Sequence, residues 1–568
     1  MSRIPPFLIA AMIALSAPFP AFAQPPSLEL VMTPHSTGGE DSYLGVAMML
    51  EAPQLAAGDG LVRLPLVLVG IPSARYDGDA LTARDDNGPL ALTQTEEPPT
   101  PQGVYRRWSV TRATNGDVVV TYKAPPRRVT AATNNGPLFD LREEAGGFAG
   151  AGVGFIATPV APGPYSVRLT WDLSDAPRDS FGVWSLGEGE VNTVAPSDLL
   201  SFSYYAVGPL NRFPPQGEDS KFGLYWLAEP PFDAAALAAR IEALYDVMSS
   251  FFKEDQSSYR VFMRQNPYKG RGGSALAGSF MFGYDPEANP TIDDLQGLLA
   301  HEMAHNWPRM EGEHGETAWY SEGTAEYYSL LLAYRGGLLS VEKYLEEINA
   351  RAFGYYTNPY RALSNKEAAD RFWTDPVAQT VPYGRGFMYL VETDAAIRAA
   401  TKGKRSLDDI VLEMHRRQNN AEPYGIPEWL HLVGKEIGAR KARRMYESMT
   451  AGDLLIADTA RYAPCFEAVE KPARVFQLGF ARSSLNDDRV VKDVEAGSQA
   501  AEAGVMNGDH ILEVKGLEET RKDQTATLTL TIERGDAKFD VTYLPRGPEL
   551  AGYAWSRVAG ADEAACKF

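Results

Sequence analysis

Cysteine, histidine and net positive charge are all scarce in this chain of 568 residues, which contains 2 cysteines and 7 histidines. So few cysteines exclude a small protein held together by several disulfides. The 54 basic residues are outnumbered by 74 acidic residues, which gives a net charge of -20. Such a chain is repelled by phosphate backbones and anionic lipids, so we do not expect nucleic acid as a partner. A hydrophobic fraction of 44% excludes a largely disordered chain.

Long apolar runs are also absent once the first residues are passed. Near the start, Arg3 precedes the apolar stretch 7–15, and Ala21-Phe22-Ala23 has the small-x-small pattern of a signal-peptidase site. We expect residues 1–23 to be a cleavable signal peptide, with an uncleaved anchor as the alternative. No later run reaches the 18 or so apolar residues that span a bilayer. We therefore expect a periplasmic or secreted protein that is not stably inserted in a membrane.

The length allows about three or four domains, and the patterning predicts three. From 24 to 228, short apolar runs between turn residues predict an all-β domain. Within it, Asn115-Gly116 lies between two alternating runs and predicts a hairpin. From 229 to 455 we expect an α+β domain with a helical second half. Short strands return in 465–568, where Cys465 and Cys566 could form one disulfide in an oxidising compartment or remain two thiols.

The segment that carries chemistry reads His301-Glu302-Met303-Ala304-His305. It lies in a predicted amphipathic helix over 291–307, which Pro308 ends. Four-residue spacing places His301 and His305 on one face, where two imidazoles can bind one zinc ion. Glu302 is adjacent to that face, as a general base must be to reach an attacking water.

A catalytic zinc site needs a third protein ligand and one open position. A metzincin would place a histidine where this chain has Glu311, so that pattern does not fit. His314 is close in sequence, but it lies in a polar segment and a solvated loop histidine is the better interpretation. Glu322 fits best, near the start of a second helix that Ser321 could cap. One turn later, Glu326 could either accept a hydrogen bond from a ligand histidine or face solvent.

These residues resemble the gluzincin metallopeptidases, in which a glutamate in a Trp-x-x-Glu-Gly segment, here Trp319 to Gly323, completes the site. The resemblance implies that Tyr383, in Tyr-Gly-Arg-Gly, stabilises the oxyanion. It also implies that Gly272 and Gly273 belong to a strand that binds substrate. In that strand, Ala275 replaces the glutamate that binds the free amine in the aminopeptidase branches.

The last domain resembles a PDZ domain. Phe476-Gln477-Leu478-Gly479-Phe480 is similar to a carboxylate-binding loop, and the Gly-rich segment 497–512 is similar to the corresponding part of PDZ domains in exported bacterial proteases. An unrelated β-rich domain is the alternative. The order of β domain, thermolysin-like gluzincin domain and PDZ domain resembles the glycyl aminopeptidase family, which is related to aminopeptidase N.

We therefore expect an exported metallopeptidase with one Zn²⁺ ion, which hydrolyses peptide bonds of peptide or protein substrates. The resemblance favours an aminopeptidase of the glycyl aminopeptidase type. Because Ala275 replaces the amine-binding glutamate, an endopeptidase remains an alternative. A non-enzymatic protein that binds peptide termini through its PDZ domain is the other alternative, and a closed zinc site using His314 would favour it.

Overall fold

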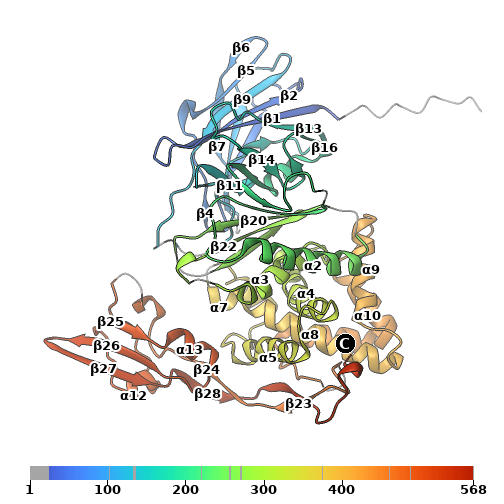
Figure 1. Cartoon of the computed structure of the whole chain (residues 1–568), viewed down its shortest axis with the longest axis vertical. Helices are drawn as coiled ribbons and strands as arrows, with labels where there is room; N and C mark the ends of the chain where they lie inside the picture. The colour runs from blue at the N-terminus through green and yellow to red at the C-terminus, as the bar shows by residue number, and fades with distance from the viewer. Residues whose placement is uncertain are drawn as a thin grey trace, which may run out of the picture.

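The computed structural model describes residues 25–568 apart from 101–102, 132, 134–135, 219, 255–257, 269–270, 289, 374, 459–460, 486–487 and 567. The expected signal peptide lies outside these residues. Figure 1 shows a β-rich part at one end, a mixed sheet below it, a group of helices, and a smaller unit beside the helices. No helix in the described part of the chain is long and apolar enough to cross a membrane.

The N-terminal part is built from three sheets, and almost all of their strands run antiparallel. The largest, in order, is β16 (Val191–Ala195), β13 (Tyr165–Trp171), β1 (Ser27–His35), β2 (Tyr43–Leu50), β9 (Val118–Ala124), β5 (Leu81–Asp85) and β6 (Gly88–Leu90). The second is β12 (Thr158–Pro159), β3 (Gly60–Leu68), β8 (Gly103–Val110) and β7 (Leu92–Glu96), with β4 (Ile71–Pro72) paired to β3. The third is β10 (Arg142–Glu144), β11 (Gly147–Ala151), β17 (Tyr204–Gly208), β14 (Phe181–Trp184) and β15 (Gly187–Glu188). Alternate residues of β1 and β2 are buried, so one face of each strand lies in the core.

The predicted hairpin at Asn115-Gly116 is wrong. Gly116 has a positive φ of 67°, so the turn chemistry is present. However, β8 pairs with β3 and β7, whereas β9 pairs with β2 and β5 in the other sheet. The Asn115 backbone N–H donates to Asp85, so this turn carries the chain from one sheet to the next. A local turn signal does not determine which strands pair.

A mixed sheet links the β-rich part to the helices. Its order is β18 (Asn211–Phe213), β19 (Phe222–Trp226), β20 (Tyr259–Gln265), β22 (Ser279–Tyr284) and β21 (Gly272–Leu276). Strands β19, β20 and β22 run parallel, and β21 is an antiparallel edge strand. The mixed sheet thus begins near residue 211, before the expected boundary at 229. Tyr204, Phe262 and Met281 share one buried cluster, so the third N-terminal sheet packs directly on the mixed sheet.

Helices cover the other face of the mixed sheet (Figure 1). Two helices, α2 (Ala234–Phe252) and α3 (Ile292–Ala304), lie against the sheet. The helical part continues with α4 (His314–Arg335), α5 (Val341–Thr357), α6 (Asn365–Ala369), α7 (Pro376–Gln379), α8 (Val381–Thr401), α9 (Leu407–Asn419), α10 (Ile426–Ile437) and α11 (Ala439–Ala451). A short helix, α1 (Ser197–Ser201), lies in the β-rich part. The α2 helix begins after Asp233, whose side chain caps it by accepting a hydrogen bond from the Ala236 backbone N–H.

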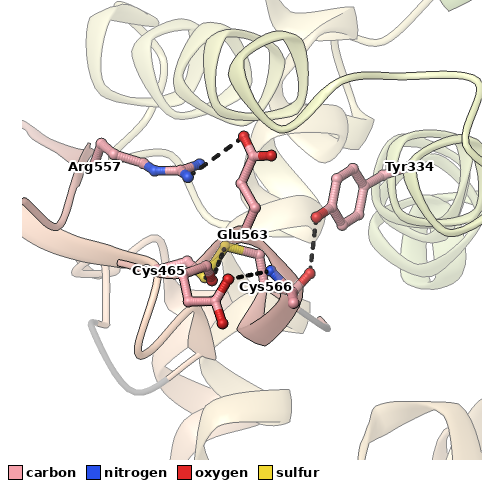
Figure 2. Close-up of a disulfide and its surroundings, with 7 residues drawn as sticks. Tyr334, Cys465, Arg557, Glu563 and Cys566 are labelled. Carbon is pink, nitrogen blue, oxygen red and sulfur yellow. Dashed lines mark hydrogen bonds and ion pairs between the residues drawn. A yellow bond between two sulfur atoms is a disulfide. The ribbon is translucent and has the colours of Figure 1, made fainter. Parts of the chain in front are cut away.

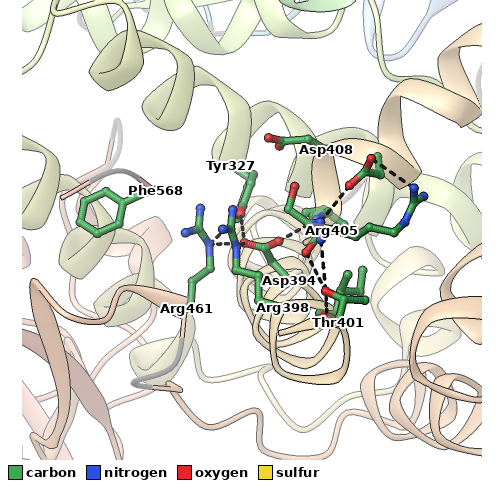
Figure 3. Close-up of polar contacts among 12 residues, drawn as sticks. Tyr327, Asp394, Arg398, Thr401, Arg405, Asp408, Arg461 and Phe568 are labelled. Atoms are coloured by element: carbon green, nitrogen blue, oxygen red, sulfur yellow. Dashed lines mark hydrogen bonds and ion pairs between the residues drawn. The ribbon is translucent and has the colours of Figure 1, made fainter. Parts of the chain in front are cut away.

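A buried carboxylate, Asp394 of α8, ties several elements together (Figure 3). It lies 2.6 Å from Arg461 and 2.8 Å from Arg398, and it accepts a hydrogen bond from Tyr327 of α4. Burial by itself disfavours the charge, but the two arginines and the Leu407 backbone N–H hold the pKa of Asp394 below its usual value. The network therefore fixes α4 against α8.

Asp394→Asn is expected to lower the free energy of unfolding by about 3–5 kcal/mol, because the variant leaves Arg461, which is 0% exposed, without a counter-charge. Urea unfolding followed by circular dichroism measures the loss. Lys366→Gln removes one charge from the exposed pair Lys366–Asp370 and is the matched control, with an expected change below about 1 kcal/mol. Equal stability of both variants would show that the network does not hold α4 against α8.

The C-terminal unit has a core of its own, which includes Leu478, Ile511 and Leu530. Its strands form three small sheets: β23 (Phe466–Glu470) with β29 (Tyr553–Arg557), β24 (Ala473–Phe476) with β28 (Arg546–Leu550), and β25 (His510–Lys515) with β26 (Leu528–Arg534) and β27 (Ala537–Tyr543). Two short helices accompany them, α12 (Gln499–Glu502) and α13 (Leu517–Lys522).

Cys465 and Cys566 form a disulfide that closes this region on the helices (Figure 2). The Tyr334 hydroxyl of α4 donates to the Cys566 carbonyl oxygen at 2.8 Å. Cys465, Cys566 and Phe568 belong to the same buried cluster as the helical core. The disulfide, which the sequence left open, therefore joins the two ends of the C-terminal unit where they pack against α4 and its neighbours.

Candidate active site

Two packed helices bring the expected metal ligands together. His301 lies in the last turn of α3, and His305 lies in the turn that follows, one residue beyond the helix end. The helix is shorter than the predicted 291–307 because the chain turns before Pro308, with the Trp307 backbone N–H bonded to the Ala304 carbonyl oxygen. Trp307 is 0% exposed, so it anchors this turn in the core.

The second helix begins earlier than predicted. It starts at His314, so Ser321 lies within the helix and is not its cap. The Ser321 hydroxyl instead lies 3.4 Å from Nδ1 of His305. His314 is not in a solvated loop, because its ring packs against Phe372 and Trp373. The helix ends at Arg335, and Gly336 follows it as the C-cap.

His301, His305 and Glu322 offer three ligand atoms that face one another, and no other group of this kind occurs among the described residues. Nε2 of His301 and Nε2 of His305 are 3.1 Å apart, and each lies 3.4 Å from Oε2 of Glu322. In a tetrahedral zinc site with bonds of about 2.0–2.1 Å, ligand atoms lie about 3.3–3.4 Å apart. Oε2 of Glu322 is buried and has no hydrogen-bond partner. The three residues therefore fit a zinc ion.

The electrostatics of this group also favour a cation. Burial would lower the pKa of His301, but Glu322 and Glu326 raise it to about 10. Burial would raise the pKa of Glu322, but the two histidines hold it well below its usual value. The cluster therefore attracts positive charge, as a binding site for a divalent ion must.

Glu326 fixes the orientation of His301. Its Oε1 lies 3.2 Å from Nδ1 of His301, and its Oε2 accepts a hydrogen bond from Nε of Arg351 at 2.7 Å. Glu326 thus faces the ligand histidine and does not face solvent. Such a carboxylate holds the imidazole with Nε2 directed at the metal. Arg351, from α5, was not found in the sequence analysis, because nothing in the local pattern shows that α5 packs beside α4.

Glu302 lies on α3, the helix that also carries His301, and it lies beside the edge strand β21. It is 8% exposed, and its carboxylate accepts a hydrogen bond from the Ala275 backbone N–H. Burial raises its pKa, and the two histidines oppose the rise. A Cβ built on Gly273 would lie 2.4 Å from Cγ of Glu302. Gly273 therefore leaves the space that the Glu302 side chain occupies.

Gly273→Ala is expected to displace Glu302 and to reduce kcat/KM of the proposed reaction by about a hundredfold, because a misplacement of 1 Å can cost that much. Zinc content and melting temperature should change little, since the side chain can move without disturbing the backbone. Gly354→Ala is the matched control, because a Cβ there meets nothing within 4 Å. Full activity of Gly273→Ala would show that the position of Glu302 is not important.

Tyr383 reaches the site from the first turn of α8. Its ring stacks on His301, with ring centroids 5.6 Å apart. Burial raises the pKa of Tyr383 well above its usual value, and Glu322 and Glu302 add to the effect. The phenol therefore keeps its proton.

A glycine pair explains how Tyr383 comes so close to the ligands. A Cβ on Gly323 would lie 2.6 Å from the backbone of Gly386, so α4 and α8 cross with their backbones in contact. Glu322 and Tyr383 flank this crossing on their respective helices. The glycines of the two sequence motifs therefore serve helix packing.

His301, Glu302, Glu326 and Tyr383 line a pocket of about 470 Å³. Gly272, Gly273 and Ser274 of β21 line one side, together with Gly136 and Pro137 of the β-rich part. The Leu138 backbone N–H donates to Oγ of Ser274 at 3.0 Å, which places this loop against the strand. Gln379 of α7 and Arg351 of α5 line the pocket as well. No sequence pattern predicts that the loop, Gln379 or Arg351 reaches this pocket, because each approaches it through tertiary packing.

No protein-family model matches the chain, and no curated protein sequence matches it. The fold is similar to that of an aminopeptidase N family protein from Idiomarina loihiensis, with a TM-score of 0.66 and 15% identity over 93% of this chain and 98% of that chain. An M1 zinc metallopeptidase from Deinococcus radiodurans, solved with a bound Tyr-Ser-Ala substrate, matches 76% of this chain and 95% of its own with a TM-score of 0.47 and 18% identity. At 15% identity, the first likeness shows a common fold.

Proposed function

We propose that this protein is a zinc metallopeptidase of the aminopeptidase N type. The observation that carries the proposal is the convergence of His301, His305 and Glu322 at tetrahedral separations beside a buried glutamate and a buried phenol. The fold shared with an aminopeptidase N family protein supports it. His314 supplies no fourth ligand to the group, which argues against a closed structural site and against a purely binding role.

His301, His305 and Glu322 would hold one zinc ion, which would polarise the scissile carbonyl and lower the pKa of water. Glu302 accepts the proton of the attacking water and then passes it to the leaving amine. Burial raises the pKa of Glu302 toward neutral pH, so this carboxylate can first accept a proton and then donate it. Tyr383 donates a hydrogen bond to the oxygen that develops negative charge. Arg351 and Glu326 keep His301 in position.

Tyr383→Phe is expected to reduce kcat by about a hundred- to a thousandfold, because it removes one donor to the oxyanion, and to leave KM nearly unchanged. Initial rates on a peptide substrate measure both quantities. Tyr360→Phe, at a tyrosine outside the pocket, is the matched control and should be fully active. A hundred- to thousandfold rise in KM, with kcat unchanged, would instead show that Tyr383 binds substrate and does not stabilise the oxyanion.

Within this class, we propose the glycyl aminopeptidase type, with the substrate backbone added along the free edge of β21 at Gly272 and Gly273. One observation favours an endopeptidase as a second candidate. Glu302 and Glu326 are the only carboxylates among the described residues lining the pocket, and Glu326 already pairs with His301 and Arg351. No free carboxylate there corresponds to the amine-binding glutamate that Ala275 replaces.

Paired peptides, each with a free and an N-acetylated amino terminus, test the proposal when incubated with and without a zinc chelator. We expect chelator-sensitive hydrolysis, identified by mass spectrometry. Stepwise loss of N-terminal residues from the free peptides alone would establish an aminopeptidase. Internal cleavage of both members would establish the endopeptidase. No hydrolysis by protein shown to contain zinc would contradict both candidates.

We further propose that the protein is exported to the periplasm or secreted, that its C-terminal unit is a PDZ-like domain that binds peptide ends, and that nucleic acid is not a partner. The Cys465–Cys566 disulfide supports export, because disulfides persist in oxidising compartments. The net charge of -20 opposes nucleic-acid binding.

A further inference from the structure

A second cavity, of about 320 Å³, is lined by residues of α2, α3, α4 and α5. We call it the lateral pocket. Ala300 of α3 and Leu330 and Ala333 of α4 are buried and form its apolar part, which Leu338 and Leu339, just after α4, extend. Among the described residues that line this cavity, none takes part in the proposed reaction.

The charged residues around the lateral pocket pair with one another. Arg240 donates a hydrogen bond to Gln296 at 2.7 Å and lies 3.9 Å from Asp293. Lys343 lies 3.0 Å from Glu347. All of these residues line the pocket. Among the lining residues that the structure describes, each charge therefore has a partner of opposite sign, and the chemistry that the pocket favours is an apolar group.

Gly297 lies on the border between the lateral pocket and the catalytic pocket, because it lines both. At about 100° per residue, Asp293 and Ala300 of the lateral pocket point about 40–60° to one side of Gly297. On the same scale, His301 and Leu298 of the catalytic pocket point about 40–100° to the other side. A Cβ built on Gly297 would meet no described atom within 4 Å. A glycine at this position therefore leaves open space between the two pockets.

Two other helices also run from one pocket to the other. In α5, Arg351 lines the catalytic pocket, and Glu347, four residues earlier, lines the lateral pocket. In α4, Glu326 and Leu330 divide in the same way. Residues four apart share one face of a helix and lie about 6 Å apart along its axis. The two pockets are therefore successive parts of one cleft, and two residues of an extended peptide, at about 3.3 Å each, span the step between them.

We propose that the lateral pocket is a substrate subsite that takes a large apolar side chain from a residue close to the scissile bond, and that Gly297 keeps it open to the catalytic pocket. The apolar residues of α3 and α4 pack against that side chain, which leaves water when it binds. The inference rests on the proposed peptidase function for the nature of its ligand, but binding in the lateral pocket does not require turnover.

Isothermal titration calorimetry on the full-length, zinc-loaded Glu302→Gln variant measures binding where turnover is slowed. The probes are the hexapeptide Ser-Ala-Ser-Ala-Ser-Ala and six variants of it, each with phenylalanine at a different position. We expect phenylalanine at one position to tighten binding about ten- to a hundredfold, because burial of a side chain of this size is worth that much. Equal affinities across the set, or no binding of any peptide, would overturn the proposal.

Gly297→Leu, added to the same protein, distinguishes the lateral pocket from other places that could hold phenylalanine. The leucine side chain fills the opening, so the preferred peptide should bind at least about tenfold more weakly and lose its advantage over the parent peptide. Leucine favours a helix more than glycine does, so the change poses little risk to folding. Gly354→Leu is the matched control, because a Cβ there also meets no described atom within 4 Å, and it should keep the preference.

Leu339→Asp tests the other end of the lateral pocket. It places a charge beside the bound side chain, so it should also weaken binding of the preferred peptide at least about tenfold. The melting temperature shows whether each variant is folded. Folded Gly297→Leu and Leu339→Asp proteins that both keep the preference for phenylalanine would place that side chain elsewhere in the catalytic pocket and overturn the proposal.

The same peptides, incubated with the zinc-loaded wild-type protein, test the proposed reaction separately. A preference for phenylalanine in binding that Gly297→Leu removes, without hydrolysis of any peptide, would support the subsite and contradict the peptidase. Hydrolysis of all seven peptides with equal kcat/KM and equal affinity would support the peptidase and overturn the subsite.

Discussion

Glu302→Gln is expected to reduce kcat/KM by about a hundred- to ten-thousandfold, the range that a positioned general base contributes. The amide keeps the size of the side chain but cannot accept the proton of the attacking water. Zinc content should remain at one ion per chain, because Glu302 is not among the three residues that face the metal position. The loss of activity should therefore appear in fully loaded protein.

Initial rates, zinc content by mass spectrometry and the melting temperature of the same preparation check this expectation. Glu144→Gln is the matched control, since burial already raises the pKa of Glu144 to about 7 and the residue lies outside the catalytic pocket. We expect the control to keep full activity. An active Glu302→Gln enzyme would sink the proposed mechanism, because no other unpaired carboxylate among the described residues lines the pocket.

Glu322→Gln is expected to abolish zinc binding at stoichiometric metal, and activity with it. The change removes the only negative charge among the three ligands and leaves the two histidines as neutral donors. Glu326→Gln provides a graded comparison. Because Glu326 contacts His301 and does not face the metal position, its loss should weaken zinc affinity only about 10- to 100-fold.

Competition with a chromophoric chelator measures both zinc affinities, and circular dichroism shows whether each variant is folded. The expected order is wild type, then Glu326→Gln, then Glu322→Gln. A folded Glu322→Gln protein that retains zinc and activity would require a different third ligand, and His314 at the start of α4 would then be the residue to test. Equal losses in the two variants would contradict the distinct positions of the two carboxylates.

His301, His305 and the base Glu302 could be predicted from sequence because their signals are local, whereas Glu322 lies on a separate helix and meets them only through the packing of α3 and α4. Four-residue spacing on a helix determines that His301 and His305 share a face, and it determines that Glu302 lies next to them. Local rules of the same kind explain the Asp233 cap of α2 and the alternate burial along β1 and β2. In each case the geometry depends on residues within one or two turns, so the amino-acid order is enough.

Other features depended on which elements pack together. The Asn115-Gly116 turn joins two sheets, because strand pairing is decided by long-range packing and not by turn chemistry. The pairing of Arg351 with Glu326 and the crossing at Gly323 and Gly386 arise only when α4, α5 and α8 meet. By itself the sequence determined the residue types and local spacing of the site, whereas the tertiary structure decided which distant residues complete it.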